Sequence, residues 1–142
     1  PEMSRGLGDV YKRQLQELLK YTDMLMLDIK HIDDEQHKIL TGQSNKNILE
    51  FARYLSDIKK PIWIRHVLVP ERSDKDEYLE RLHDFIETLD NVERVEVLPY
   101  HTLGAYKWKE LGYDYKLEGI DPPTPERIEN ANRILETAKY LK

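Results

Sequence analysis

The chain contains no cysteine among its 142 residues. Disulfide bonds, thiolate nucleophiles and cysteine ligands for zinc or an iron–sulfur cluster are therefore excluded within this sequence. Glycine and proline are scarce, at 6 and 7 residues, which argues against a collagen-like or low-complexity chain. The longest aliphatic runs, Met24–Leu27 and Val67–Val69, are far shorter than the roughly 20 residues that span a bilayer. We expect no membrane segment and, without an apolar signal segment, a cytoplasmic location.

Charged residues are plentiful, and the two signs nearly balance. Lys and Arg number 22 and Asp and Glu number 27, which gives a net charge of −5. This mild acidic excess argues against a nucleic-acid partner bound by general electrostatics. The length favours one domain. Residues 1–13 have no periodicity and no helix cap, so we interpret them as a foreign or artefactual tail and residues 15–142 as the folded part.

Hydrophobic patterns predict strands that alternate with amphipathic helices. Three apolar runs have the length and composition of strands, at residues 24–29, 61–70 and 92–98. Helix-start signals stand between and after them: Asp33–Asp34, Ser44–Asn45, a capping box of Asp74 with Glu77, and Thr124–Pro125 with Ala138 in the last apolar face. Gly42 is placed to end the first of these helices. An early helical tail around Leu15, Leu18 and Leu19 precedes the first strand.

Units of about 35 residues, each a strand followed by a helix, are typical of a parallel sheet in an α/β fold. Three strands are too few for a closed barrel. The chain is then either a small open sheet or one part of a larger barrel. We favour the C-terminal part of an incomplete (β/α) barrel.

Four charged or titratable residues follow or end the predicted strands. Ligands of parallel α/β folds bind where the carboxyl ends of the strands meet. Asp28 and Lys30 leave the first strand, Arg65 lies on the second, and His101 follows the third. If the strands are adjacent, these side chains converge on a pocket that suits an anionic ligand group.

Each of these residues also has a structural interpretation. Asp28 and Lys30 could form an ion pair, Arg65 a structural salt bridge, and His101 a hydrogen bond with the backbone. By strand alternation His66 faces away from Arg65, and we expect it to be structural.

Other polar and aromatic residues give weaker signals. His31 and His37 match no metal-site spacing. An aromatic cluster could stack on a nucleoside, but we expect it to pack a long loop: Tyr100, Tyr106, Trp108, Tyr113 and Tyr115. Phosphate-loop, nucleophile-elbow and zinc-protease motifs are missing from the sequence.

Several longer blocks stand in a recognisable order and spacing. They are Met24–Lys30, Leu40–Gly42, Ser44–Asn45, Leu49–Ala52, Trp63–Pro70, Val95–His101, Leu103–Gly104 and Tyr106–Trp108. Together these blocks closely resemble the C-terminal part of pyruvate formate-lyase activating enzymes, in the radical S-adenosylmethionine superfamily. The resemblance runs from Leu15 to the C-terminus.

The resemblance implies an incomplete (β/α) barrel with S-adenosylmethionine and a [4Fe-4S] cluster as cofactors. It implies a 5′-deoxyadenosyl radical that takes hydrogen from a glycine of the partner, pyruvate formate-lyase, with reduced flavodoxin or a similar protein as electron donor. Lys30 and His101 match positions that contact S-adenosylmethionine, and Arg65 matches a basic residue of the same pocket. Asp28, with the backbone carbonyl of Met26, matches the ligands of a monovalent cation.

This sequence also departs from the family pattern. The cluster cysteines in CxxxCxxC and the first barrel strands are missing, so we expect the chain alone to be inactive. Glu71 follows Pro70 where the family usually has glycine. Two alternatives stay open, an activase of another glycyl radical enzyme and a non-catalytic module that binds a small anion or a protein. The unpaired edge of the first strand also predicts self-association.

Overall fold

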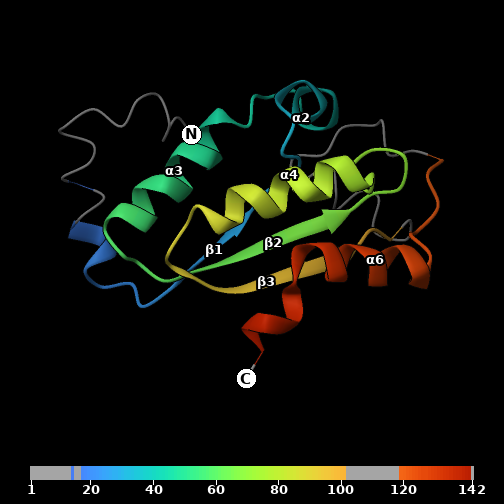
Figure 1. The fold of residues 1–142 in the computed structure, drawn as a ribbon. Coiled ribbons are helices and arrows are strands. Elements are labelled where there is room, and N and C mark those ends of the chain that lie inside the picture. The colour runs from blue at the N-terminus through green and yellow to red at the C-terminus, as the bar shows by residue number, and fades with distance from the viewer. Residues whose placement is uncertain (1–13, 15–16, 102–118, 142) are drawn as a thin grey trace.

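Three parallel strands form the centre of the fold. The structure is a computed structural model, and it describes residues 14, 17–101 and 119–141 (Figure 1). Strands β1 (Leu25–Asp28), β2 (Ile62–Leu68) and β3 (Val92–Pro99) form one sheet in the order β1-β2-β3, and both pairings are parallel. The predicted α/β fold with three parallel strands is confirmed.

Helices connect the strands as the sequence predicts. They are α2 (Asp34–Thr41), α3 (Lys46–Asp57), α4 (Asp76–Glu87) and α6 (Pro125–Leu135), followed by the 3₁₀ helix η3 (Thr137–Tyr140). The carboxylate of Asp33 accepts a hydrogen bond from the Gln36 amide at 3.1 Å and so caps α2. Gly42 ends this helix in the left-handed conformation, at φ 78°, which glycine adopts without steric cost.

Two predictions about helix ends are wrong. Helix α4 begins after Lys75, and no side chain caps it, so Asp74 and Glu77 do not form a capping box. Asp74 instead accepts a hydrogen bond from the Glu71 amide at 3.2 Å and pairs with Arg127 of α6. Ala138 is exposed in η3, because α6 ends at Leu135 and Glu136 takes a left-handed backbone conformation.

The main hydrophobic core lies between the sheet and three helices. Helices α3, α4 and α6 pack on the same face of the sheet (Figure 1). From the strands, Leu27, Ile62, Ile64 and Val95 enter this core, all at 5 % exposure or less. Each is followed directly by a residue whose side chain points to the opposite face, as the period of two in a strand requires.

A smaller core lies near the carboxyl ends of β2 and β3. Tyr100 is 1 % exposed there and packs with apolar side chains from α2, β2 and the segment before α6: Leu40, Val67, Val69 and Ile120. Tyr100 therefore packs a core of the fold, whereas Tyr106, Trp108, Tyr113 and Tyr115 lie outside the described residues. No helix in the described part of the chain is long and apolar enough to cross a membrane.

Candidate functional site

Asp28 and Arg65 lie side by side at the carboxyl half of the sheet. They are register partners on β1 and β2, and the Arg65 Nε lies 3.6 Å from the Asp28 Oδ1. The Arg65 Nη1 lies 3.9 Å from the Met26 Sδ. The Arg65 Nε is buried but has no hydrogen-bond partner among the described residues. A buried guanidinium N–H without an acceptor is unusual and leaves bonding capacity for an anionic group.

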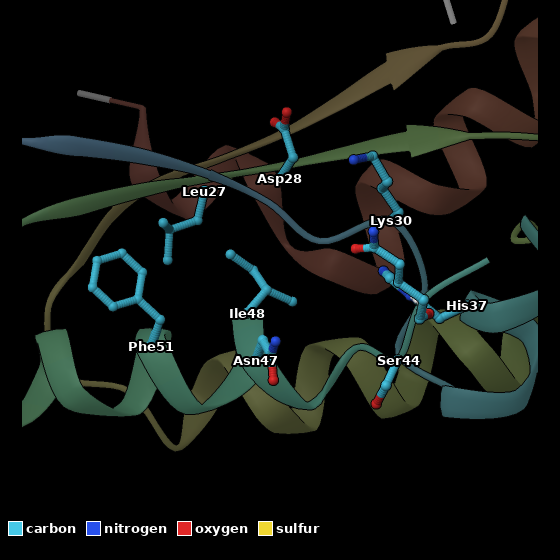
Figure 2. Close-up of a pocket in the computed structure, with 9 residues that line it drawn as sticks. Leu27, Asp28, Lys30, His37, Ser44, Asn47, Ile48 and Phe51 are labelled. Carbon is cyan, nitrogen blue, oxygen red and sulfur yellow. Dashed lines mark hydrogen bonds between the residues drawn. The ribbon is translucent and has the colours of Figure 1, made fainter. Parts of the chain in front are cut away.

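Lys30 lies two residues beyond the end of β1. Its ammonium group is partly buried, and this burial lowers the pKa of Lys30 from its usual value near 10.5, while the nearby Asp28 carboxylate acts in the opposite direction. In Figure 2 the Lys30 side chain extends toward Asp28 at the rim of a cavity. A partly desolvated cation gains more from an incoming anion than a fully hydrated one.

The cavity beside Lys30 lies between β1, the α2–α3 connection and α3, and measures about 330 Å³. It has a polar end and an apolar end (Figure 2). Nine residues line it: Leu27, Asp28, Lys30, His37, Gln43, Ser44, Asn47, Ile48 and Phe51. The predicted convergence is therefore partial, because Asp28 joins Lys30 in this cavity and joins Arg65 on the sheet. Neither Arg65 nor His101 lines the cavity, and His101 is exposed beyond the end of β3.

The main chain of β1 has one strand neighbour in the part of the chain described. The amides of Leu25 and Ile29 donate to Pro61 O and Arg65 O of the β2 side, at 3.1 and 3.0 Å. Because a parallel strand directs successive residues to alternate neighbours, the carbonyl groups of Met26 and Asp28 point to the free edge. The Met26 carbonyl therefore points away from β2, to a side where no strand lies among the described residues.

His37 lines the cavity, although it is not among the predicted site residues. Its Nδ1 donates to Gln43 O at 2.5 Å, so the neutral ring keeps Nε2 as an acceptor. Burial lowers the pKa of His37 from 6.5, and the positive charge of Lys30 lowers it further. The helical period of α2 places His37 on the same side as Leu40, and this was the only signal in the sequence.

His31 and His66 are structural, as expected for the second. His31 is fully buried, and its ring bonds Arg72 O at 2.8 Å and the Asp33 amide at 3.0 Å. Burial lowers the pKa of His31 to about 4. His66 is 2 % exposed, and its Nδ1 donates to Ile29 O at 2.7 Å, while burial lowers its pKa.

One group of potential metal ligands occurs among the described residues, and it includes neither Asp28 nor Met26, the predicted ligands of a cation. His83, Glu87 and Glu136 bring their ligand atoms within 4.8 Å of one another on α4 and after α6. Lys139 forms ion pairs with both glutamates, and the His83 Nε2 lies 2.6 Å from the Glu136 Oε2. We assign this group to an ion-pair network that joins α4 to η3.

The fold and site together define an α/β domain in which charged side chains gather at the carboxyl ends of parallel strands. The family follows from comparison with known proteins. A family model described as the radical SAM superfamily matches residues 2–86, more than half of the chain, so the chain belongs to the radical SAM superfamily.

Two relatives named pyruvate formate-lyase-activating enzyme are identical to this chain at more than half of the aligned residues. The pyruvate formate-lyase-activating enzyme of Streptococcus mutans is 55 % identical over 130 residues, which are 92 % of this chain and 49 % of the relative. The enzyme of that name from Listeria monocytogenes is 54 % identical over 127 residues, or 89 % of this chain and 51 % of the relative. The chain spans about half the length of these relatives.

Solved structures support the fold. A domain of the pyruvate-formate lyase-activating enzyme from Bacteroides vulgatus superposes with a TM-score of 0.72 at 21 % identity, over 91 % of this chain and 70 % of that one. A radical SAM methyltransferase from Sphaerobacter thermophilus gives a TM-score of 0.59 at 15 % identity, over 87 % of this chain and 34 % of the other. At these identities the likeness concerns the fold alone.

Proposed function

We propose that this chain supplies the carboxyl-end cofactor site of a pyruvate formate-lyase activating enzyme, and that this site binds S-adenosylmethionine. One observation carries the proposal. In a chain that is 55 % identical to an enzyme of that name, Asp28 pairs with Arg65 and faces Lys30 at the strand ends. Both the family and the charges of the site point to the same class of ligand.

The residues present fit S-adenosylmethionine. Its methionine part carries a carboxylate and an ammonium group, which require a cation and an anion at short separation. Lys30 and the Nε of Arg65, which makes no hydrogen bond among the described residues, would bind the carboxylate, with His101 as a further contact from the end of β3. When reduced, bound S-adenosylmethionine supplies the radical chemistry of this superfamily.

Asp28 and the Met26 carbonyl would hold a monovalent cation beside that carboxylate. Both groups are oxygen donors, as hard cations require, and Met26 and Asp28 are exposed residues of β1. The role of the ion there is to lower the repulsion between the Asp28 carboxylate and the ligand carboxylate.

The residues do not fit an iron–sulfur cluster, because the chain has no cysteine to ligate iron. We therefore expect the chain alone to have no activase activity. The protein substrate would be pyruvate formate-lyase, with a reduced flavodoxin-like donor, and the location would be cytoplasmic.

Equilibrium dialysis with S-adenosylmethionine tests the site. Lys30→Met should weaken binding about tenfold or more, because a hydrogen bond to a charged group contributes about 1.5–3 kcal/mol. Lys46→Met, on the exposed start of α3, is the matched control and should bind as the unmodified chain does.

The binding result separates the alternatives. Equal affinity of Lys30→Met and Lys46→Met would remove Lys30 from the site. Binding of acetate or phosphate as tightly as S-adenosylmethionine would favour a general anion-binding module instead.

A further inference from the structure

Asn45 occupies the first position before α3 but does not cap this helix. Its side chain accepts no hydrogen bond from the first turn, and its backbone is already helical, at φ −89° and ψ 0°. The side chain is instead directed away from the helix, and the residue is 2 % exposed. Its Nδ2 donates to Ile32 O at 2.8 Å and to His31 O at 3.1 Å. An amide that is not used for capping and binds two carbonyls elsewhere has another role.

The two carbonyls belong to the segment that carries Lys30. On one side of Lys30, Ile29 is fully buried, its amide donates to Arg65 O, and its carbonyl accepts from the His66 Nδ1. On the other side, His31 is fully buried and its ring bonds Arg72 O. Asn45 completes this arrangement, because it bonds the backbone immediately after Lys30.

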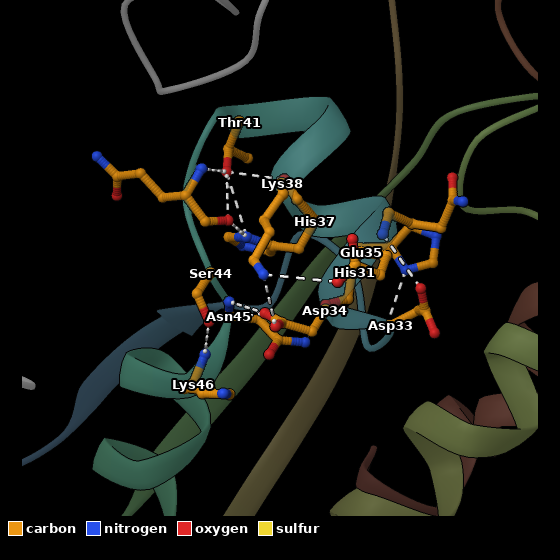
Figure 3. Close-up of polar contacts among 12 residues, drawn as sticks. His31, Asp33, Asp34, Glu35, His37, Lys38, Thr41, Ser44, Asn45 and Lys46 are labelled. Carbon is orange, nitrogen blue, oxygen red and sulfur yellow. Dashed lines mark hydrogen bonds and ion pairs between the residues drawn. The ribbon is translucent and has the colours of Figure 1, made fainter.

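Asn45 is itself held in place by Asp34, at the start of α2. The Asp34 Oδ1 accepts from the Asn45 amide at 2.8 Å and from the Ser44 Oγ at 2.7 Å (Figure 3). These hydrogen bonds favour the carboxylate form and lower the pKa of Asp34 to about 2. Hydrogen bonds therefore join the two segments in both directions. The Asn45 side chain binds the backbone after β1, and the Asp34 side chain binds Ser44 and Asn45 at the start of α3.

We infer that Asn45 is a positioning residue for Lys30: it holds the backbone of His31 and Ile32 so that Lys30 stays beside Asp28 at the strand ends. The inference rests on the proposed function for the identity of the ligand. The positioning of Lys30 by Asn45 does not rest on the proposed function, since the contacts of Asn45 are independent of what Lys30 binds. A ligand anion would then meet a cation whose backbone is already ordered, which lowers the entropic cost of binding.

The absence of cysteine allows a direct test, because one introduced thiol is unique. Lys30→Cys places the thiol at the position in question, and its rate of reaction with a disulfide reagent reports exposure. Adding Asn45→Ser keeps a good helix-start residue but removes the amide that reaches the two carbonyls. The rate should rise about tenfold, because loosening the segment both exposes the thiol and removes the burial that disfavours the thiolate.

Asn91→Ser is the matched control. Asn91 is also a buried amide that donates to a backbone carbonyl, Lys60 O at 2.7 Å, but it lies at the amino ends of the strands. In the Lys30→Cys background, Asn91→Ser should leave the rate of the thiol reaction unchanged. It should lower the free energy of unfolding about as much as Asn45→Ser does. Equal rates for Asn45→Ser and Asn91→Ser would overturn the inference. If Asn45→Ser does not fold, Asn45→Asp at neutral pH takes its place under the same criterion.

The second measurement is equilibrium dialysis with S-adenosylmethionine, in variants that keep Lys30. Asn45→Ser should weaken binding about tenfold and Asn91→Ser should not. If the unmodified chain does not bind S-adenosylmethionine, the proposed function fails, and the thiol rates still decide the role of Asn45. If it binds and Asn45→Ser binds equally well, the positioning role is wrong while the proposed function stands.

Discussion

The two faces of the sheet are built from the same strands but have opposite chemistry. One face is covered by α3, α4 and α6 and carries Leu27, Ile64 and Val95 into the core. The other carries Asp28 and Arg65 at the same level of the sheet. Parallel sheets are normally apolar and covered on both faces. In the part of the chain that the structure describes, this second face is charged, as the proposed ligand site requires.

Neighbouring residues of β2 show the difference most clearly. Ile64 is fully buried among the helices, whereas Arg65, the next residue, has a side chain that is 35 % exposed. The free energy of folding should therefore depend on the first face and ligand affinity on the second.

The largest expected effect is on the covered face. Ile64→Ala should lower the free energy of unfolding by about 2–5 kcal/mol, because it removes buried methylene groups and leaves a cavity. Arg65→Ala should cost about 1 kcal/mol or less, since its ion pair with Asp28 is long and partly exposed. Urea denaturation measures both. Similar losses for the two variants would show that the open face also carries the stability of the fold.

The fully buried His31 should make the fold sensitive to acid. Its pKa is about 4 in the folded chain and about 6.5 when unfolded. Between these values the unfolded chain binds more protons, so the free energy of unfolding falls as pH drops from 6.5 to 4, by about 3 kcal/mol in all. His31→Gln keeps a donor for Arg72 O and should flatten this part of the pH profile. His83→Gln, at the surface network, is the control.

The pH profile of His31→Gln can also contradict this prediction. The buried rings of His37 and His66 also have lowered pKa values, so some dependence on pH should remain in His31→Gln. A profile identical to that of the unmodified chain would mean that the pKa of His31 does not differ between the folded and the unfolded chain.

The strands and most helices were predictable because each signal is local. Alternation places Leu27 and Ile29 inside and Met26 and Asp28 outside, and Gly42 ends α2 as its position indicates. The capping box at Asp74 was wrong because tertiary contacts with Arg127 override a local pattern.

The site was predictable in its residue types but not in its arrangement. The end of a strand is visible in the sequence, so Asp28, Lys30 and Arg65 could be selected. The contribution of Asn45 could not, because its amide acts across 13 and 14 residues of sequence rather than on its own helix. His37 was missed for the same reason, since its place beside Lys30 depends on how α2 packs.

The side of β1 that faces away from β2 has no strand neighbour among the described residues. Its outward main-chain groups and the Met26 side chain, which is 52 % exposed, can pair with a second copy of the chain. We expect self-association in size-exclusion chromatography. Met26→Lys should weaken it about tenfold, because a lysine on an edge strand disfavours pairing between chains. Lys20→Met, at an exposed site before β1, should leave the elution unchanged. A monodisperse monomer from the unmodified chain would contradict the expectation.

The smallest effect should come from the open face near the start of the strands. The Arg94 guanidinium lies 4.7 Å from the centre of the Trp63 ring, its register partner on β2. A double-mutant cycle with Trp63→Leu and Arg94→Leu should give a coupling of about 0.5–1 kcal/mol, as expected for a cation–π contact near the surface. Neither substitution should change binding of S-adenosylmethionine, since both residues precede the carboxyl ends of the strands. A loss of binding in Arg94→Leu would instead extend the ligand surface from Asp28 and Arg65 to Arg94. One face of the sheet would then be packed and the other would bind ligand along its full length.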